Sequence, residues 1–136
     1  WHLKGKAHLV MSLQEFKRNN YGNALEDLNS AIDAFDAFST FSKGEEEEAK
    51  KDINEDLMVF LKELIATKNV KAAEMALLAI LEKKKELKEL LKPIYIAVEI
   101  VKSKDVSKYY DLQVEMREVV ADIVKKLTGS EELLPE

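Results

Sequence analysis

The sequence contains no cysteine and has only two prolines, four glycines and two histidines among its 136 residues. The absence of cysteine excludes disulfides, thiolate metal sites and a cysteine nucleophile, and His2 and His8 are too few for most histidine-built catalytic centres. With 35% charged and 46% hydrophobic residues, the chain does not resemble a collagen, a low-complexity protein or a disordered protein. The composition therefore predicts an all-helical chain, and its length fits one domain.

Long apolar runs are also missing. The longest ones, around residues 72–81 and 93–98, are far shorter than the ~20 residues that a membrane-spanning helix needs. The first ten residues lack the apolar core and the small-residue cleavage site of a signal peptide. We therefore expect no membrane partner and a cytoplasmic location.

The chain has fewer basic than acidic residues, 21 against 26, and its net charge is −5. Nineteen of the basic residues are lysine, whereas nucleic-acid recognition needs a positive surplus and favours arginine. We expect no strong nucleic-acid binding by the isolated domain. The charge is unevenly distributed: residues 1–21 and 57–92 each carry +3, residues 22–56 carry −8 and residues 93–136 carry −3. Such blocks can attract one another or a partner.

Apolar residues recur every three or four positions along most of the chain, which predicts amphipathic helices. Turn-tolerant residues separate the periodic segments, for example around Asn19 to Gly22, Ser39 to Gly44 and Thr67 to Asn69. The predicted helices cover about 1–19, 21–38, 43–67, 70–92, 93–102 and 106–127. These five or six helices, arranged in antiparallel hairpins, would form a single all-helical domain over residues 1–129, followed by a frayed tail over residues 130–136.

The helix registers predict which residues enter the core. The first helix should bury the stripe Leu3, Ala7, Val10, Leu13 and Phe16. Pro93 should end or kink the fourth helix, because proline has no amide hydrogen to donate. The last helix should run without interruption to a stop at Gly129, and its apolar stripe is Val106, Tyr109, Tyr110, Met116, Val119, Val120, Ile123 and Leu127.

Two stretches, each at the turn and start of the second helix of a hairpin, align without gaps 49 residues apart. Their matching residues are Asn20, Tyr21, Ala24, Leu28, Ala31 and Ile32 against Asn69, Val70, Ala73, Leu77, Ile80 and Leu81. Small Ala24 and Ala73 are expected to let a neighbouring helix come close. Over about 40 residues, Tyr21, Ala24 and Ala31, with Trp1, Leu3 and Gly5 upstream, resemble a tetratricopeptide repeat. The resemblance implies a short array of helical hairpins, and a compact bundle is the alternative.

The length, the helix count and the early motif NYGNAL also resemble the small helical HEPN domains of nucleotide-binding and RNA-cleaving modules. The cleaving members carry an arginine followed within a few residues by a histidine, late in the sequence. Here no histidine follows Arg117. This resemblance therefore implies a nucleotide-binding domain without the nuclease activity.

No residues form a recognisable catalytic or metal-binding set. Carboxylate pairs such as Glu45 with Glu48 lack the histidines of bridged iron sites, and phosphate-binding glycine loops, GxSxG and HExxH are missing. We predict no catalytic residue, metal ligand or cofactor. Aromatic side chains often anchor interfaces, and four of them are the predicted partner-binding residues: Phe41, Tyr95, Tyr109 and Tyr110.

These observations favour a non-enzymatic helical domain that acts in protein–protein interaction or assembly. Its expected partner is another protein or a second copy of the chain, with a homodimer favoured. Two alternatives stay open: a HEPN-like nucleotide-binding domain that lacks the nuclease motif, and a small helical subunit of a nucleoprotein complex.

Overall fold

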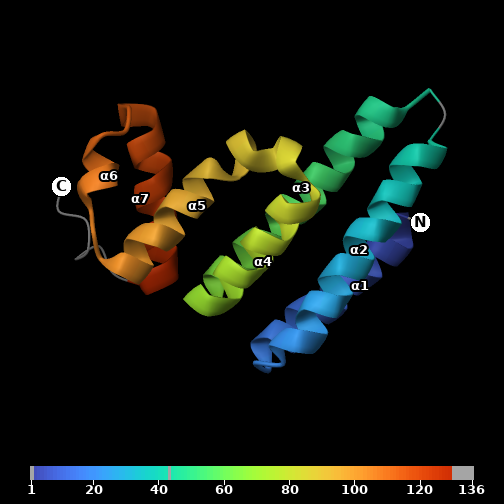
Figure 1. Ribbon diagram of the computed structural model, residues 1–136, viewed down its shortest axis with the longest axis horizontal. Helices are drawn as coiled ribbons and strands as arrows, with labels where there is room; N and C mark the ends of the chain where they lie inside the picture. Colours follow the sequence, from blue (N-terminus) through green and yellow to red (C-terminus); the bar gives the residue numbers. More distant parts are fainter. Residues whose placement is uncertain (1, 43, 130–136) are drawn as a thin grey trace. The chain divides into compact units, whose positions relative to one another are not determined.

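The protein is all-helical in the part of the chain that the structure describes. This computed structural model, shown in Figure 1, describes residues 2–42 and 44–129, so the predicted tail over residues 130–136 lies outside it. Six helices of 14 to 21 residues, together with one short helix and one 3-10 turn, make up its elements. They are α1 (His2–Lys17), α2 (Tyr21–Phe41), α3 (Glu46–Ala66), α4 (Val70–Lys83), η1 (Lys85–Leu87), α5 (Lys88–Ser103), α6 (Ser107–Tyr110) and α7 (Val114–Thr128). The predicted all-helical bundle of five or six helices is confirmed.

Internal contacts divide the chain into two compact units, Trp1–Leu64 and Ile65–Glu136. The first unit contains α1, α2 and nearly all of α3, and the second contains α4 to α7. The predicted single domain over residues 1–129 is not tested by this division and stays a prediction. Within the described residues, no helix is both long enough and apolar enough to cross a membrane.

The first unit is built on a close antiparallel hairpin of α1 and α2. The hairpin turns at Asn19, whose φ of 63° lies in the left-handed region that asparagine tolerates better than most residues. Gly5 lies so close to α2 that a Cβ there would be 2.4 Å from Cε1 of Phe35. Further along, the Ser12 hydroxyl donates a hydrogen bond of 2.7 Å to the carbonyl of Ala24, which is fully buried. The expectation that Ala24 faces a neighbouring helix is therefore confirmed.

The predicted core stripe of the first helix is wrong at Leu3, Ala7 and Val10 and right at Phe16, which is 1% exposed. Leu3 is 82% exposed and Val10 is 56% exposed, and Ala7 is exposed as well. The buried residues of α1 form a second stripe with equally regular spacing: Gly5, Leu9, Ser12 and Phe16. The small members of that stripe allow α2 to approach, and this close contact decides which side of α1 is covered.

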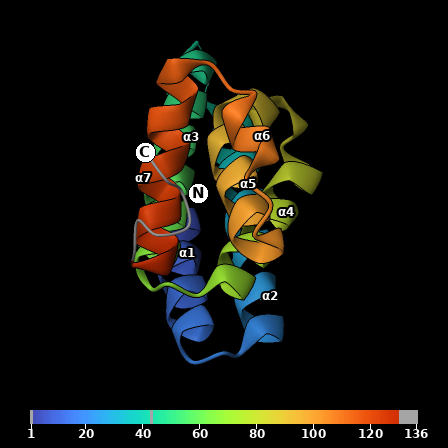
Figure 2. The same ribbon diagram turned by 90° about the vertical axis from the view of Figure 1, so that its left-hand side faces the viewer.

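The second unit packs bulky aliphatic side chains between its helices. Figures 1 and 2 both show α5 and α7 lying side by side. Ala73 is fully buried, as predicted for it. The other buried residues of α4, η1, α5 and α7 include Ala72, Ala76, Leu77, Ile80, Leu87, Leu91, Ile94, Ile96, Ala97, Val98, Ile100, Val120, Val124 and Leu127.

Pro93 does not end a helix, contrary to the prediction, because the break lies nine residues earlier at Lys84. Lys84 lies four residues after Ile80 and three before Leu87. At the break its side chain is 14% exposed, and its amine lies 3.9 Å from the Glu86 carboxylate. Pro93 lies in the second turn of α5, where its missing amide removes a single helical hydrogen bond.

The last predicted helix is interrupted, also contrary to expectation. The chain leaves the helix after Tyr110 and resumes it at Val114. The guanidinium of Arg117 donates hydrogen bonds to the carbonyls of Leu112 (2.8 Å) and Tyr110 (2.7 Å), so these carbonyls have partners outside a helix. Val119 is 48% exposed rather than buried. Gly129 ends α7 as predicted, with a φ of 73°.

Candidate functional site

A groove in the second unit is lined by residues of α4, η1, α5 and the connection between α6 and α7. We call it the Tyr95 groove. Its volume is about 830 Å³, within the range of ligand and peptide sites. It lies where α4 breaks, η1 turns and α5 begins, beside the connection between α6 and α7. Its lining residues are Leu81, Lys85, Lys88, Glu89, Lys92, Tyr95, Ile96, Glu99, Asp111 and Leu112.

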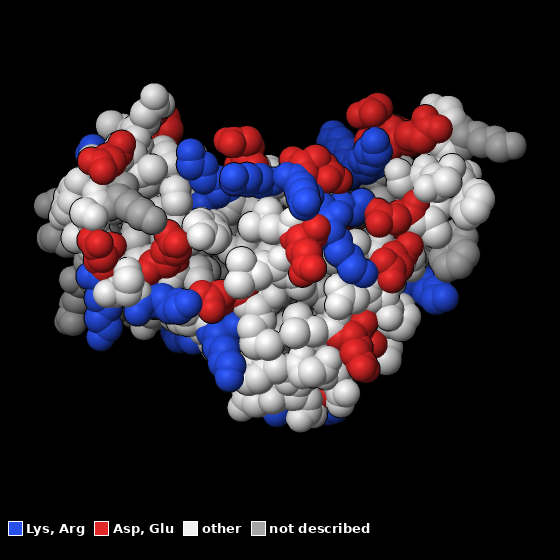
Figure 3. Space-filling view, in the orientation of Figure 1, with Lys and Arg blue, Asp and Glu red and all other residues white. Residues whose placement is uncertain are grey.

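The Tyr95 groove combines an apolar base with charged margins of both signs. Leu81 and Leu112 are half-buried and Ile96 is 8% exposed, so aliphatic surface is available inside it. Three lysines line the groove along one stretch of chain, and three acidic residues line it as well. Figure 3 shows basic and acidic side chains interspersed over the segment between α4 and α5. The groove is therefore an amphipathic surface without an excess of either charge.

An ion pair between α4 and α5 lies beside this region. The Lys102 ammonium is 2.7 Å from the Glu74 carboxylate. This hydrogen bond, together with the negative charge of Glu74, raises the pKa of Lys102 above its ordinary value. The pair ties two helices of the second unit together at their surface.

The structure brings one predicted partner-binding tyrosine into the groove, and the other two precede its lining residue Asp111 in the sequence. Tyr95 is 40% exposed and lines the groove directly. Tyr109 and Tyr110 form an edge-to-face ring pair with centroids 5.4 Å apart, and Tyr110 directly precedes Asp111, which lines the groove. Tyr109 is half-buried and Tyr110 is 47% exposed. None of the three tyrosines is fully buried within the chain.

The fourth predicted residue, Phe41, belongs to the other unit. It ends α2 and is 69% exposed. One helical turn earlier, Phe38 contacts the ring of His2 with centroids 4.7 Å apart, so Phe41 lies at the end of the hairpin where α1 begins. The structure therefore does not assign Phe41 to the Tyr95 groove.

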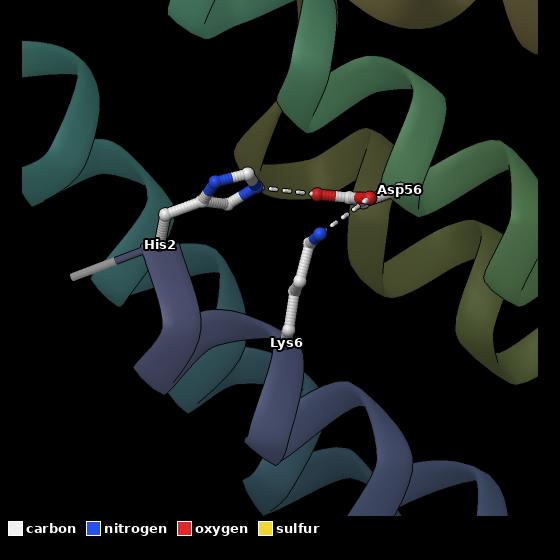
Figure 4. Close-up of polar contacts among 3 residues, drawn as sticks. All are labelled: His2, Lys6 and Asp56. Atoms are coloured by element: carbon white, nitrogen blue, oxygen red, sulfur yellow. Dashed lines mark hydrogen bonds and ion pairs between the residues drawn. The ribbon is translucent and has the colours of Figure 1, made fainter.

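Polar contacts on α1 form a second candidate centre, in the first unit. His2 Nε2 lies 2.7 Å from Asp56 Oδ2 of α3, and the Lys6 amine lies 4.0 Å from the same carboxylate (Figure 4). The His2 ring also packs against Phe35 and Phe38. These contacts hold the imidazole between aromatic rings and a carboxylate, an arrangement that fixes its position.

A similar pair connects α1 with α2. His8 Nδ1 lies 3.2 Å from Asp27 Oδ1, and both side chains are largely covered. The two histidines of the chain thus each contact one aspartate, and the two aspartates lie on different helices. Among the described residues, no group of three or more His, Cys, Asp or Glu side chains is arranged to hold a metal ion. The pairs tie α1 to its neighbours on two sides.

Sequence reasoning missed most of the groove. The helix expected over residues 70–92 breaks at Lys84, and Lys85, Lys88 and Lys92 line the groove after the break. Leu112 was missed because the last helix was expected to be continuous. The sequence holds a signal for this second break in Arg117, five residues after Leu112, whose guanidinium can bind free carbonyls.

Comparison with known proteins adds no relative, because no family model, curated protein or solved structure matches the chain.

Proposed function

We propose that the chain is a non-enzymatic, cytoplasmic helical domain that binds a protein partner through the Tyr95 groove. The observation that carries this proposal is the groove itself, which combines aliphatic side chains with an exposed tyrosine. Tyrosine is a frequent anchor of protein interfaces, because it buries a large rigid ring and keeps a polar end. The partner is another protein or a second copy of the chain.

Charges at the groove margins support a protein partner over a nucleotide. A nucleotide could use Lys85, Lys88 and Lys92 for its phosphates and the Tyr95 ring for its base. Glu89, Glu99 and Asp111 line the same groove, however, and lower the local positive potential that phosphates require. Interspersed charges of both signs instead suit the rim of a protein interface.

Site-specific photo-crosslinking tests this function. The photoreactive residue p-benzoylphenylalanine replaces Tyr95 or Tyr110, and a control places it at Glu26, an exposed position of α2. We expect one discrete protein adduct from the groove positions and none from the control. Leu112→Arg should abolish the Tyr95 adduct, because it places a guanidinium at a half-buried apolar position of the groove.

Two results would contradict the proposal. Crosslinks spread over many proteins, with no effect of Leu112→Arg, would show that the groove makes no specific interface. Saturable binding of ATP that protects the Lys88 amine from acetylation, without any protein adduct, would favour the nucleotide-binding alternative.

A further inference from the structure

Helix α1 has two apolar stripes, of which the structure covers one. Gly5, Leu9, Ser12 and Phe16 are buried. On the opposite side Leu3 is 82% exposed, Val10 is 56% exposed and Met11 is 48% exposed. A helix with apolar residues on both sides is normally covered on both sides. The exposed stripe is therefore available for an interface.

Most of the charges that border this stripe are basic. At 100° per residue, Lys4, Lys6 and Lys17 fall along its edges and Gln14 falls within it, whereas Arg18 follows the end of α1; all five are exposed. We call this surface the α1 outer face; it comprises Leu3, Lys4, Lys6, Ala7, Val10, Met11, Gln14, Lys17 and Arg18. Glu15 is the only acidic residue of α1 and lies at the margin.

Two ion pairs at the α1 outer face are long. Arg18 lies 3.6 Å from Glu15, and Lys6 lies 4.0 Å from Asp56. Pairs of this length at a solvent-exposed surface are screened by water and salt, and they leave the basic side chains able to attract a carboxylate.

We propose that the α1 outer face binds an amphipathic helix of a partner protein whose apolar stripe is bordered by carboxylates. The spacing of Leu3, Ala7 and Val10, four residues and then three, is the spacing at which two helices pack along their length. Ala7 is small and lies between two larger side chains, so it lets a partner backbone come close. The carboxylates of the partner would meet the basic edges.

Two other occupants of the α1 outer face fit its charge less well. A second copy packed through the same helix would bring basic edges against basic edges, in either orientation of the two helices. An acidic lipid surface would meet the anionic neighbours of α1, because α2 carries four acidic residues and no lysine or arginine, and the first turn of α3 carries three glutamates. A single acidic helix needs to cover only the α1 outer face itself.

The test uses the full chain and a stapled, monomeric peptide of about three heptads, with leucine at the apolar positions and glutamate at the flanking ones. A matched peptide carries lysine in place of glutamate. We expect the acidic peptide to bind at least about tenfold more tightly than the basic one, with affinity falling as salt rises. Amide chemical-shift changes should concentrate on residues 3–18.

Variants then locate the binding. Val10→Glu should weaken the acidic peptide by about tenfold or more, because it puts a carboxylate in the middle of the stripe. Val119→Glu is the matched control, since Val119 is a similarly exposed helical valine in the other unit, and it should leave the affinity unchanged. Both variants should fold, because glutamate favours helix more than valine does.

Three outcomes would overturn the inference. The first is equal affinity for the two peptides, and the second is an equal effect of Val10→Glu and Val119→Glu. The third is a dimer of the unliganded chain in sedimentation that Val10→Glu dissociates, which would assign the α1 outer face to a second copy. Binding of the acidic peptide should not involve the Tyr95 groove. Leu112→Arg should therefore leave the affinity for this peptide unchanged.

Discussion

The two units pack their helices in different ways. We compare the contact of α1 with α2 in the first unit with the packing around α5 in the second. In the first unit, glycine, serine and alanine bring two helix backbones together, and Phe35 fills the space over Gly5. In the second unit, large aliphatic side chains surround α5, and both chain breaks beside it leave the groove open. Close packing through small residues leaves larger apolar residues on the outside of α1, whereas interrupted helices leave apolar surface inside a concavity.

The two units therefore offer different surfaces for binding a partner. The first unit presents a convex helix face with basic edges, and the second presents a concave groove with mixed charges. A convex apolar face suits another helix, and a groove suits an anchoring side chain or a short segment. We therefore expect the two surfaces to respond to different substitutions.

The largest expected effect comes from the core of the close hairpin. Phe16 is 1% exposed, and its ring lies 6.3 Å from that of Phe60 and 6.2 Å from that of Tyr21. Phe16→Ala should lower the free energy of unfolding by about 3–5 kcal/mol, because it leaves a cavity. Phe41→Ala, at a 69% exposed position, should stay within about 0.5 kcal/mol of wild type. Urea unfolding measures both, and equal effects would refute the assignment of Phe41 to the surface.

The next largest effect is expected where α1 and α2 come close together at Gly5. A methyl group at Gly5 would lie 2.4 Å from the fully buried Phe35 ring, so Gly5→Ala should destabilise the protein by about 1–3 kcal/mol. Gly22 has no neighbour within 4 Å of such a group, and it lies in the first turn of α2. Gly22→Ala should therefore be neutral or stabilising by about 0.4–1 kcal/mol. The melting temperature should fall in Gly5→Ala and stay the same or rise in Gly22→Ala. A higher melting temperature in Gly5→Ala would show that α2 does not pack this closely against α1.

A smaller effect is expected where the second unit is interrupted. Arg117 donates to the carbonyls of Tyr110 and Leu112 through a guanidinium that lysine cannot replace. Arg117→Lys should cost roughly 1 kcal/mol and speed hydrogen exchange at residues 111–113. The same substitution at Arg18, which is exposed, serves as the control. Unchanged exchange in Arg117→Lys would mean that the connection is held by other contacts.

Sequence periodicity predicted where helices lie better than which side they bury. The turns at Asn19 and Gly129 follow from residues that tolerate a positive φ, and both were predicted. The buried side of α1 was not predicted correctly, because the exposed and the buried stripes of this helix share the same spacing. Only the small residues Gly5 and Ser12 distinguish the buried one, and their effect depends on the partner helix that they contact.

The Tyr95 groove depends on features that periodicity does not record. Its shape follows from the break at Lys84 and from the break between α6 and α7. Tyr95 could be proposed from its residue type and its position near an apolar helix. The sequence did not predict that the lysines line the groove. In the continuous helix expected over residues 70–92, their side chains would point in other directions.

The smallest expected effect concerns the surface pair between α4 and α5. Glu74→Gln removes the carboxylate that raises the pKa of Lys102, so the Lys102 pKa should fall toward its ordinary value. A lysine with a raised pKa in the folded state adds stability that is fully present below the pKa of the unfolded lysine and is lost as the pH rises through the folded-state pKa. The stability difference between wild type and Glu74→Gln should therefore exist at neutral pH, stay small because Lys102 is solvent-exposed, and vanish at strongly alkaline pH. NMR titration of the Lys102 side chain measures the pKa, with Glu63→Gln on α3 as the control that should not move it. A Lys102 titration identical in wild type and Glu74→Gln would show that the ion pair between α4 and α5 does not persist in solution.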